Sequence, residues 1–130
     1  MGVLGVGVDV VHIPRIAALL QRRGARLASR ILSPKEFSEW ESLPLSDFSR
    51  QVRFLAVRWG IKEAAYKAMY PTVRPTWKEL AYRGLNEGVK PALAYHPTAV
   101  ANKSRIGPIH VSVSHDGEYV FASVTIETPL

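Results

Sequence analysis

Cysteine is absent from the 130 residues of this chain. Disulfides and thiolate metal sites are therefore excluded, so a metal site must use oxygen or imidazole ligands. A chain without cysteine is typical of a protein that works inside the cell.

Long apolar runs and biased segments are also absent. No stretch of about 18 apolar residues is present, which excludes a membrane-spanning helix. The first residues, MGVLGVGVDV, have no basic region before an apolar one, and we expect neither a signal peptide nor a transit peptide. With 47% hydrophobic and 22% charged residues and no low-complexity tract, residues 1–130 are predicted to form one folded domain.

Negative charge is scarce. Seventeen Lys and Arg residues against eleven Asp and Glu residues give a formal net charge of +6. This balance predicts an anionic partner or substrate, such as a nucleic acid, a phosphorylated small molecule or an acidic protein.

The N-terminal segment alternates apolar residues with Gly5, Gly7 and Asp9, and this period of two predicts a strand. Two interpretations of its bare face are open. The glycines could leave space for a ligand beside Asp9, or they could be a tight packing point while Asp9 caps the next helix. A helix is then predicted after Pro14, with Arg15, Arg22 and Arg26 on or near its polar side.

Two further helices are predicted by local signals. The capping box SPKE, residues 33–36, begins a helix that ends near Pro44. The longest helical pattern runs from about Asp47 to Tyr70 and ends at Pro71. Its apolar stripe consists of Phe54, Val57, Ile61, Ala64, Ala65 and Ala68.

The second half of the chain has the pattern of strands. Residues 80–95 predict a hairpin with an Asn-Glu-Gly turn, residues 96–107 a short helix, and residues 109–126 a hairpin around Asp116 and Gly117. The predicted fold class is α+β, with an antiparallel sheet packed against a long central helix.

The stretch WGIKEAAYKA, residues 59–68, sets one carboxylate among cations on the long helix. At 100° per residue, Glu63 points away from the apolar stripe, with Trp59 and Lys67 within about 40° of it. A solvated Glu63 and Lys67 pair explains part of this pattern. The alternative is a site in which Glu63 and Asp9 hold Mg²⁺ and the cations hold phosphates.

His115 ends a predicted strand just before a turn, where a lone histidine usually makes local hydrogen bonds. Neighbouring residues on a strand point to opposite faces, so Ser114 beside it is not a credible nucleophile of a catalytic triad.

Three blocks, GVGVDVVHIPRI, RFLAVRWGIKEAAYKA and VSVSH, together resemble the holo-acyl-carrier-protein synthases, the short 4′-phosphopantetheinyl transferases. RILSPKEF and the Gly-Val-Lys-Pro of the middle hairpin agree with this, so the resemblance spans nearly the whole chain. It implies that the chain has the 4′-phosphopantetheinyl transferase fold as a single half-unit. The implied activity is transfer of the phosphopantetheine arm of coenzyme A to a serine of an apo acyl carrier protein, with release of adenosine 3′,5′-bisphosphate.

The resemblance also implies roles for particular residues. Asp9 and Glu63 are expected to bind Mg²⁺ with the coenzyme A diphosphate, and Lys67 and His115 to contact the reacting phosphates. Glu63 or a metal-bound water is the candidate acceptor of the serine proton. The remaining predicted contacts are Arg50, Arg58 and Lys62 for coenzyme A, and Arg15, Arg22 and Arg26 for the acidic carrier protein.

The same resemblance implies a homotrimer with active sites between subunits, in a bacterial cytoplasm or a mitochondrial matrix. Two departures are visible. His12 occupies a position where family members often have glutamate, and YPTVRPTW, residues 70–77, replaces a glycine-containing loop.

Two rival functions come from other classes. A basic nucleic-acid-binding module fits the charge, but the chain has no clear helix-turn-helix signature, RNA-binding aromatic motif or zinc spacing. A noncatalytic scaffold with the same fold has no need of Asp9, Glu63 and Lys67 together.

Overall fold

The computed structural model describes residues 2–130. Its elements follow the chain in this order: β1 (Val3–His12), α1 (Ile13–Arg23), α2 (Ala25–Ile31), α3 (Pro34–Glu41), α4 (Phe48–Met69), η1 (Trp77–Glu79), β2 (Leu80–Arg83), β3 (Ala92–Tyr95), η2 (Val100–Arg105), β4 (Ile109–Asp116) and β5 (Tyr119–Glu127). Here η denotes a 3₁₀ helix.

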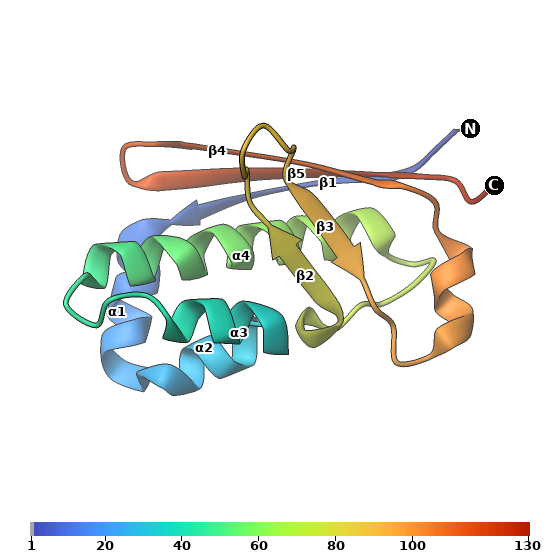
Figure 1. The fold of residues 1–130 in the computed structure, drawn as a ribbon. Coiled ribbons are helices and arrows are strands. Elements are labelled where there is room, and N and C mark those ends of the chain that lie inside the picture. The colour runs from blue at the N-terminus through green and yellow to red at the C-terminus, as the bar shows by residue number, and fades with distance from the viewer. Residues whose placement is uncertain (1) are drawn as a thin grey trace.

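The strands form two antiparallel sheets. One has three strands in the order β1-β5-β4, and the other pairs β2 with β3. The long helix α4 lies along one face of the three-stranded sheet (Figure 1). The three shorter helices α1, α2 and α3 pack below α4 in this view. The α+β prediction, with an antiparallel sheet on a long central helix, is confirmed.

Helix α4 is buried on two sides. Ile61, Ala64 and Ala68 pack toward the sheets, whereas Leu55 and Ala56 pack toward α1, α2 and α3. The predicted apolar stripe lies mainly on the first of these sides, although Phe54 packs on the second and Val57 on both. Because a second layer of helices covers the other side, apolar residues occupy more of the helix than one stripe.

The boundaries of several elements follow local chemistry. Ser33 caps α3 through the predicted capping box, in which the Ser33 side chain accepts from the Glu36 amide and Glu36 accepts from the Ser33 amide. Asp47 caps α4 in the same region. The helix predicted after Pro14 is α1, and Gly24, at φ 60°, separates it from α2, a short helix that was not predicted from the sequence.

The register of the three-stranded sheet determines which residues face α4. Asp9 pairs with Ala122, which pairs with Val113, and this row faces the helix. The next row, Val10, Phe121 and Ser114, faces outward. None of the helices in residues 2–130 is long and apolar enough to cross a membrane.

Candidate active site

The glycines of β1 let its backbone lie directly on α4. A Cβ atom added to Gly7 would stand 1.9 Å from the Ala64 carbonyl oxygen, and one added to Gly5 would stand 1.9 Å from that of Ala68. The glycines are therefore a tight packing point. Asp9 does not cap the next helix, since His12 occupies that position. The close approach brings the Asp9 side chain to the helix instead.

Asp9, Glu63 and Lys67 come together where β1 crosses α4. The Lys67 ammonium donates to the Val8 carbonyl at 2.8 Å and to the Asp9 carboxylate at 3.3 Å. Partial burial raises the pKa of Glu63, and the negative charge of Asp9 raises it further, while Lys67 and Arg15 act in the opposite direction. Two carboxylates that repel each other in a half-buried place fit a divalent cation.

Asp9 and Glu63 offer few protein ligands for a metal ion. Within residues 2–130, no group of three or more His, Cys, Asp or Glu side chains could hold a metal ion. An ion at Asp9 and Glu63 would therefore keep positions for water and phosphate oxygens, which is the usual way in which proteins hold Mg²⁺. His12 adds no ligand, because it is three positions after Asp9 on β1 and its side chain therefore points to the outer face of the sheet. There its Nε2 atom lies 3.8 Å from the Glu118 carboxylate, and its ring packs at a tilt against the Tyr119 ring.

Aromatic and cationic side chains flank Glu63 on one side. The Arg15 guanidinium lies 5.3 Å from the centre of the Trp59 ring, and the Trp59 and Trp77 ring centres are 5.1 Å apart in an edge-to-face arrangement. Trp59 is partly buried by these contacts. Sequence reasoning found Trp59 but not Trp77, which is 18 positions further along the chain and carries no local signal for this contact.

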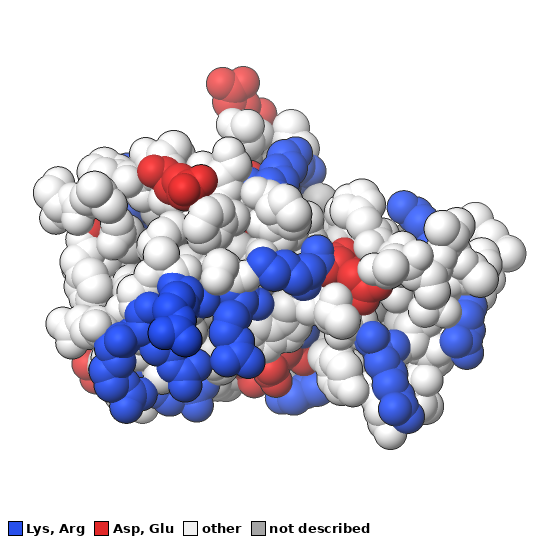
Figure 2. Space-filling model, turned by 90° about the horizontal axis from the view of Figure 1, so that it is seen from below, with Lys and Arg blue, Asp and Glu red and all other residues white. Residues whose placement is uncertain are grey.

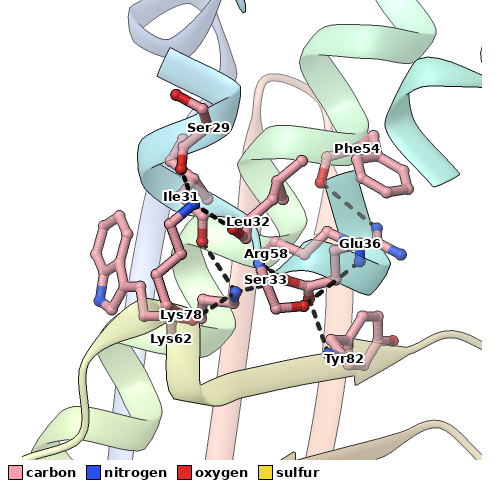
Figure 3. A network of polar contacts seen from close by, with 11 residues as sticks. Ser29, Ile31, Leu32, Ser33, Glu36, Phe54, Arg58, Lys62, Lys78 and Tyr82 are labelled. Atoms are coloured by element: carbon pink, nitrogen blue, oxygen red, sulfur yellow. Dashed lines mark hydrogen bonds and ion pairs between the residues drawn. The ribbon is translucent and has the colours of Figure 1, made fainter. Parts of the chain in front are cut away.

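Lys62 corrects a prediction, because it does not face the site. Its side chain is fully buried on another side of α4 and donates to the Ile31 carbonyl at 2.9 Å, to the Glu36 carboxylate at 2.5 Å and to the Trp77 carbonyl at 2.9 Å. Figure 3 shows it inside a polar network that joins α2, α3, α4, η1 and β2. A lysine with three interior partners has no donor left for coenzyme A phosphates.

Glu36 is the residue that completes this network. Besides Lys62, its carboxylate accepts from the amides of Ser33 and Tyr82, at 2.9 and 2.8 Å. Sequence reasoning identified Glu36 only as a helix cap. Burial lowers the pKa of Lys62 although the charge of Glu36 acts to raise it.

Arg50 and Arg58, the two arginines predicted to bind coenzyme A, line one cavity of about 510 Å³, between α3 and the first half of α4. Arg50 is exposed, but Arg58 is only 8% exposed and stacks its guanidinium 3.6 Å from the Phe54 ring centre. Burial lowers the pKa of Arg58. Its Nε is buried and has no hydrogen-bond partner among residues 2–130, although Nη1 donates to the Phe54 carbonyl.

His115 is exposed at the end of β4 and faces Val120 of β5. Strand β5 separates it from β1, so two strand spacings, about 10 Å, lie between the strand of His115 and that of Asp9. Among residues 2–130, no hydrogen bond or ion pair joins His115 to Asp9, Glu63 or Lys67. A single chain thus brings Asp9, Glu63 and Lys67 together, whereas His115 of the same chain does not contact them.

The arginines predicted to meet the carrier protein are exposed. Arg15 and Arg22 lie on α1 and Arg26 on α2. Figure 2 shows Lys and Arg side chains gathered toward one end of the lower face of the molecule, the end at which Figure 1 places α1 and α2.

Comparisons with known proteins agree with this geometry. The sequence model of the 4′-phosphopantetheinyl transferase superfamily matches residues 5–124. The holo-[acyl-carrier-protein] synthase of Yersinia pestis is 37% identical over 131 residues, which cover 98% of this chain and all of that protein.

Solved structures give the same result. The crystal structure of the holo-[acyl-carrier-protein] synthase of Neisseria meningitidis has a TM-score of 0.81 at 28% identity, covering 97% of this chain and 99% of that one. The synthase of Bacillus anthracis, solved in complex with CoA (3′,5′-ADP), has a TM-score of 0.76 at 25% identity and covers 98% and 99% of the two chains. The chain therefore belongs to the 4′-phosphopantetheinyl transferase superfamily.

Proposed function

We propose that this protein transfers the 4′-phosphopantetheine arm of coenzyme A to a serine of an apo acyl carrier protein. The observation that carries the proposal is the meeting of Asp9, Glu63 and Lys67 where β1 crosses α4. Two carboxylates and an ammonium group at one point suit a diphosphate held partly by a metal. A noncatalytic scaffold would gain nothing from such mutual repulsion between carboxylates.

In the proposed reaction, the serine Oγ forms a bond to the phosphorus that carries the pantetheine. The bond from that phosphorus to the leaving phosphate breaks, and adenosine 3′,5′-bisphosphate departs with the electron pair. Glu63 is the candidate acceptor of the serine proton, because its carboxylate lies beside Asp9 and Lys67, where the reacting phosphate is expected. When bound at Asp9 and Glu63, Mg²⁺ would supply positive charge to the diphosphate oxygens.

The cations have separate parts in this proposal. Lys67, tethered to β1, stabilises charge on the reacting phosphate, and His115 does the same from another strand. Arg50 and Arg58 both line one cavity, and their positive charges favour an anion there, in agreement with a role at the adenosine 3′-phosphate. Lys62 has no part in binding coenzyme A.

A homotrimer with sites between subunits is supported by the outer face of the three-stranded sheet. Five large apolar side chains on this face are between 42% and 59% exposed: Val6, Val8, Val10, Tyr119 and Phe121. Such a patch favours contact with another copy of the chain. Assembly on it would also allow His115 of one subunit to reach the carboxylates of another. Because the substrates are coenzyme A and a carrier protein, we place the activity inside the cell.

The activity is tested by intact mass spectrometry of an apo acyl carrier protein incubated with this protein, coenzyme A and Mg²⁺. We expect a gain of one phosphopantetheine group, and no gain when a chelator removes the metal. A protein that stays folded, binds the carrier and coenzyme A, and still transfers nothing would contradict the proposal.

The shared site is tested by complementation between inactive variants. We expect Asp9→Asn and His115→Ala each to lose about 10²-fold or more in turnover, because each removes charge stabilisation at the phosphates. When the two variants are co-expressed at equal levels, each mixed trimer regains about one site in three with both halves intact, and this amounts to about a quarter of all sites because about three quarters of the trimers are mixed. Activity near that share of wild type is the expected result. Mixed assemblies as inactive as either parent would show that each chain uses its own His115.

A further inference from the structure

A stacked pair of tyrosines and an arginine lie at and just beyond the C-terminal end of α4: Tyr66 is in the helix, Tyr70 is its C-cap, and Arg74 follows in the next segment. The rings of Tyr66 and Tyr70 lie 5.9 Å apart with an angle of 23° between their planes. The Arg74 guanidinium lies 5.2 Å from the Tyr70 ring. The two rings are 37% and 50% exposed. Tyr70 and Arg74 belong to residues 70–77, the segment in which the chain departs from the glycine-containing loop of its family.

The position of Arg74 is fixed by its neighbours. Val73 and Pro75, on either side of it, are both buried, and the Val73 amide donates to the Met69 carbonyl at 3.0 Å. The stacking on Tyr70 then fixes the guanidinium itself. Within residues 2–130, no carboxylate is close enough to form an ion pair with Arg74, so its charge is available to a partner.

Arg74 and Arg15 stand on opposite sides of Glu63. Trp59, Glu63 and Tyr70 fall within about 40° of one another around the helix axis, and thus lie along one face of α4. Arg15 is stacked on the first of these rings and Arg74 on the last. At a rise of 1.5 Å per residue, Trp59 and Tyr70, which hold the two arginines, are about 16 Å apart along the helix, with the candidate catalytic carboxylate between them.

We infer that Arg74, held on Tyr70, is a second docking point for the acidic carrier protein, on the side of Glu63 opposite to α1 and α2. The inference rests on the proposed function, because the carrier serine must approach Glu63. A carrier that presents carboxylates on both sides of its serine would meet Arg15 at one end and Arg74 at the other. Two fixed cations, one held on each side of Glu63, would then set the register of the serine.

The test compares Arg74→Glu with Lys90→Glu, which makes the same change of charge at an exposed lysine in the turn between β2 and β3. Equilibrium binding of apo carrier protein is measured for each variant, followed by the KM values for carrier and for coenzyme A. We expect Arg74→Glu to weaken carrier binding and raise its KM about tenfold, with the KM for coenzyme A unchanged. Lys90→Glu should leave both KM values near wild type, and Arg74→Lys should fall between wild type and Arg74→Glu, since lysine keeps the charge but stacks less well.

Three outcomes would overturn the inference. Arg74→Glu could bind the carrier as Lys90→Glu does, could raise the KM for coenzyme A instead, or could change the oligomeric state in solution, which would make Tyr70 and Arg74 part of a subunit contact. The binding measurement separates this inference from the proposed function. A wild-type protein that binds carrier but transfers nothing contradicts only the function, whereas loss of carrier binding in Arg74→Glu would still support the docking point.

Discussion

Replacing Glu63 with glutamine is expected to reduce transfer by about 10³-fold while raising the stability of the folded protein at neutral pH. Activity falls because the amide can neither carry the charge that holds a cation with Asp9 nor accept the serine proton. Initial rates by mass spectrometry and thermal unfolding at several pH values measure the two effects. Glu41→Gln, a change at an exposed glutamate of α3, is the control.

The gain in stability follows from the sign of the pKa shift. Burial and the nearby charge of Asp9 raise the pKa of Glu63 above its ordinary value of 4.5. The folded protein therefore holds this proton more tightly than the unfolded chain does, and ionisation of Glu63 destabilises the fold as pH rises above the unfolded value. The advantage of Glu63→Gln should thus be absent in acid, grow through the pH range between the two pKa values, and remain constant above it. A variant less stable than wild type at neutral pH would show that Glu63 is held by favourable contacts instead.

Replacing Lys62 with methionine is expected to remove about 3–5 kcal/mol from the free energy of unfolding, because it leaves the Glu36 carboxylate buried without its cation. A domain of this kind has only about 5–15 kcal/mol in total. The loss would also free the carbonyls of Ile31 and Trp77, which no longer receive a donor. Urea unfolding measures the change, and Lys35→Met, at an exposed lysine of α3, is the matched control.

A double variant distinguishes the effect of breaking the ion pair from the effect of changing the packing of the Lys62 side chain. In Lys62→Met with Glu36→Gln, both charges of the buried pair are removed together, and the amide oxygen can still accept from the backbone of Ser33 or Tyr82. We expect this protein to recover more than half of the lost stability. If the single variant unfolded within about 0.5 kcal/mol of wild type, the buried pair would not stabilise the fold.

Predictions from sequence succeeded where the signals were local. The capping box at Ser33 and Glu36 and the helix that ends before Pro71 depend on residues a few positions apart. Lys62 failed for the opposite reason. A helical wheel places it on a flank of α4, but only the complete fold shows that α3 and β2 cover that flank. The Glu36 carboxylate, which is the partner closest in space to the Lys62 ammonium, lies 26 positions earlier in the chain.

The candidate site shows the same division. Asp9, Glu63 and Lys67 could be selected as residues of interest, yet their contact depends on the bare glycine backbone of β1 lying against α4, which spacing along the chain does not reveal. The distance of His115 from them depends on the strand order, with β5 between β1 and β4. Residue types thus predicted the chemistry, and tertiary packing determined which of these residues meet within one chain.

The pairing of β1 with β5 has a consequence for synthesis of the protein. Val3 pairs with Glu127 and Val11 pairs with Val120. The first strand to leave the ribosome, β1, therefore cannot pair until the last strand, β5, has been made. Until β5 is made, the valines of β1 have no sheet to join, and β4 has no neighbour on either side. Such long-range closure slows folding and leaves an apolar strand open to wrong partners. The nascent chain is therefore most vulnerable to aggregation just before its central strand emerges.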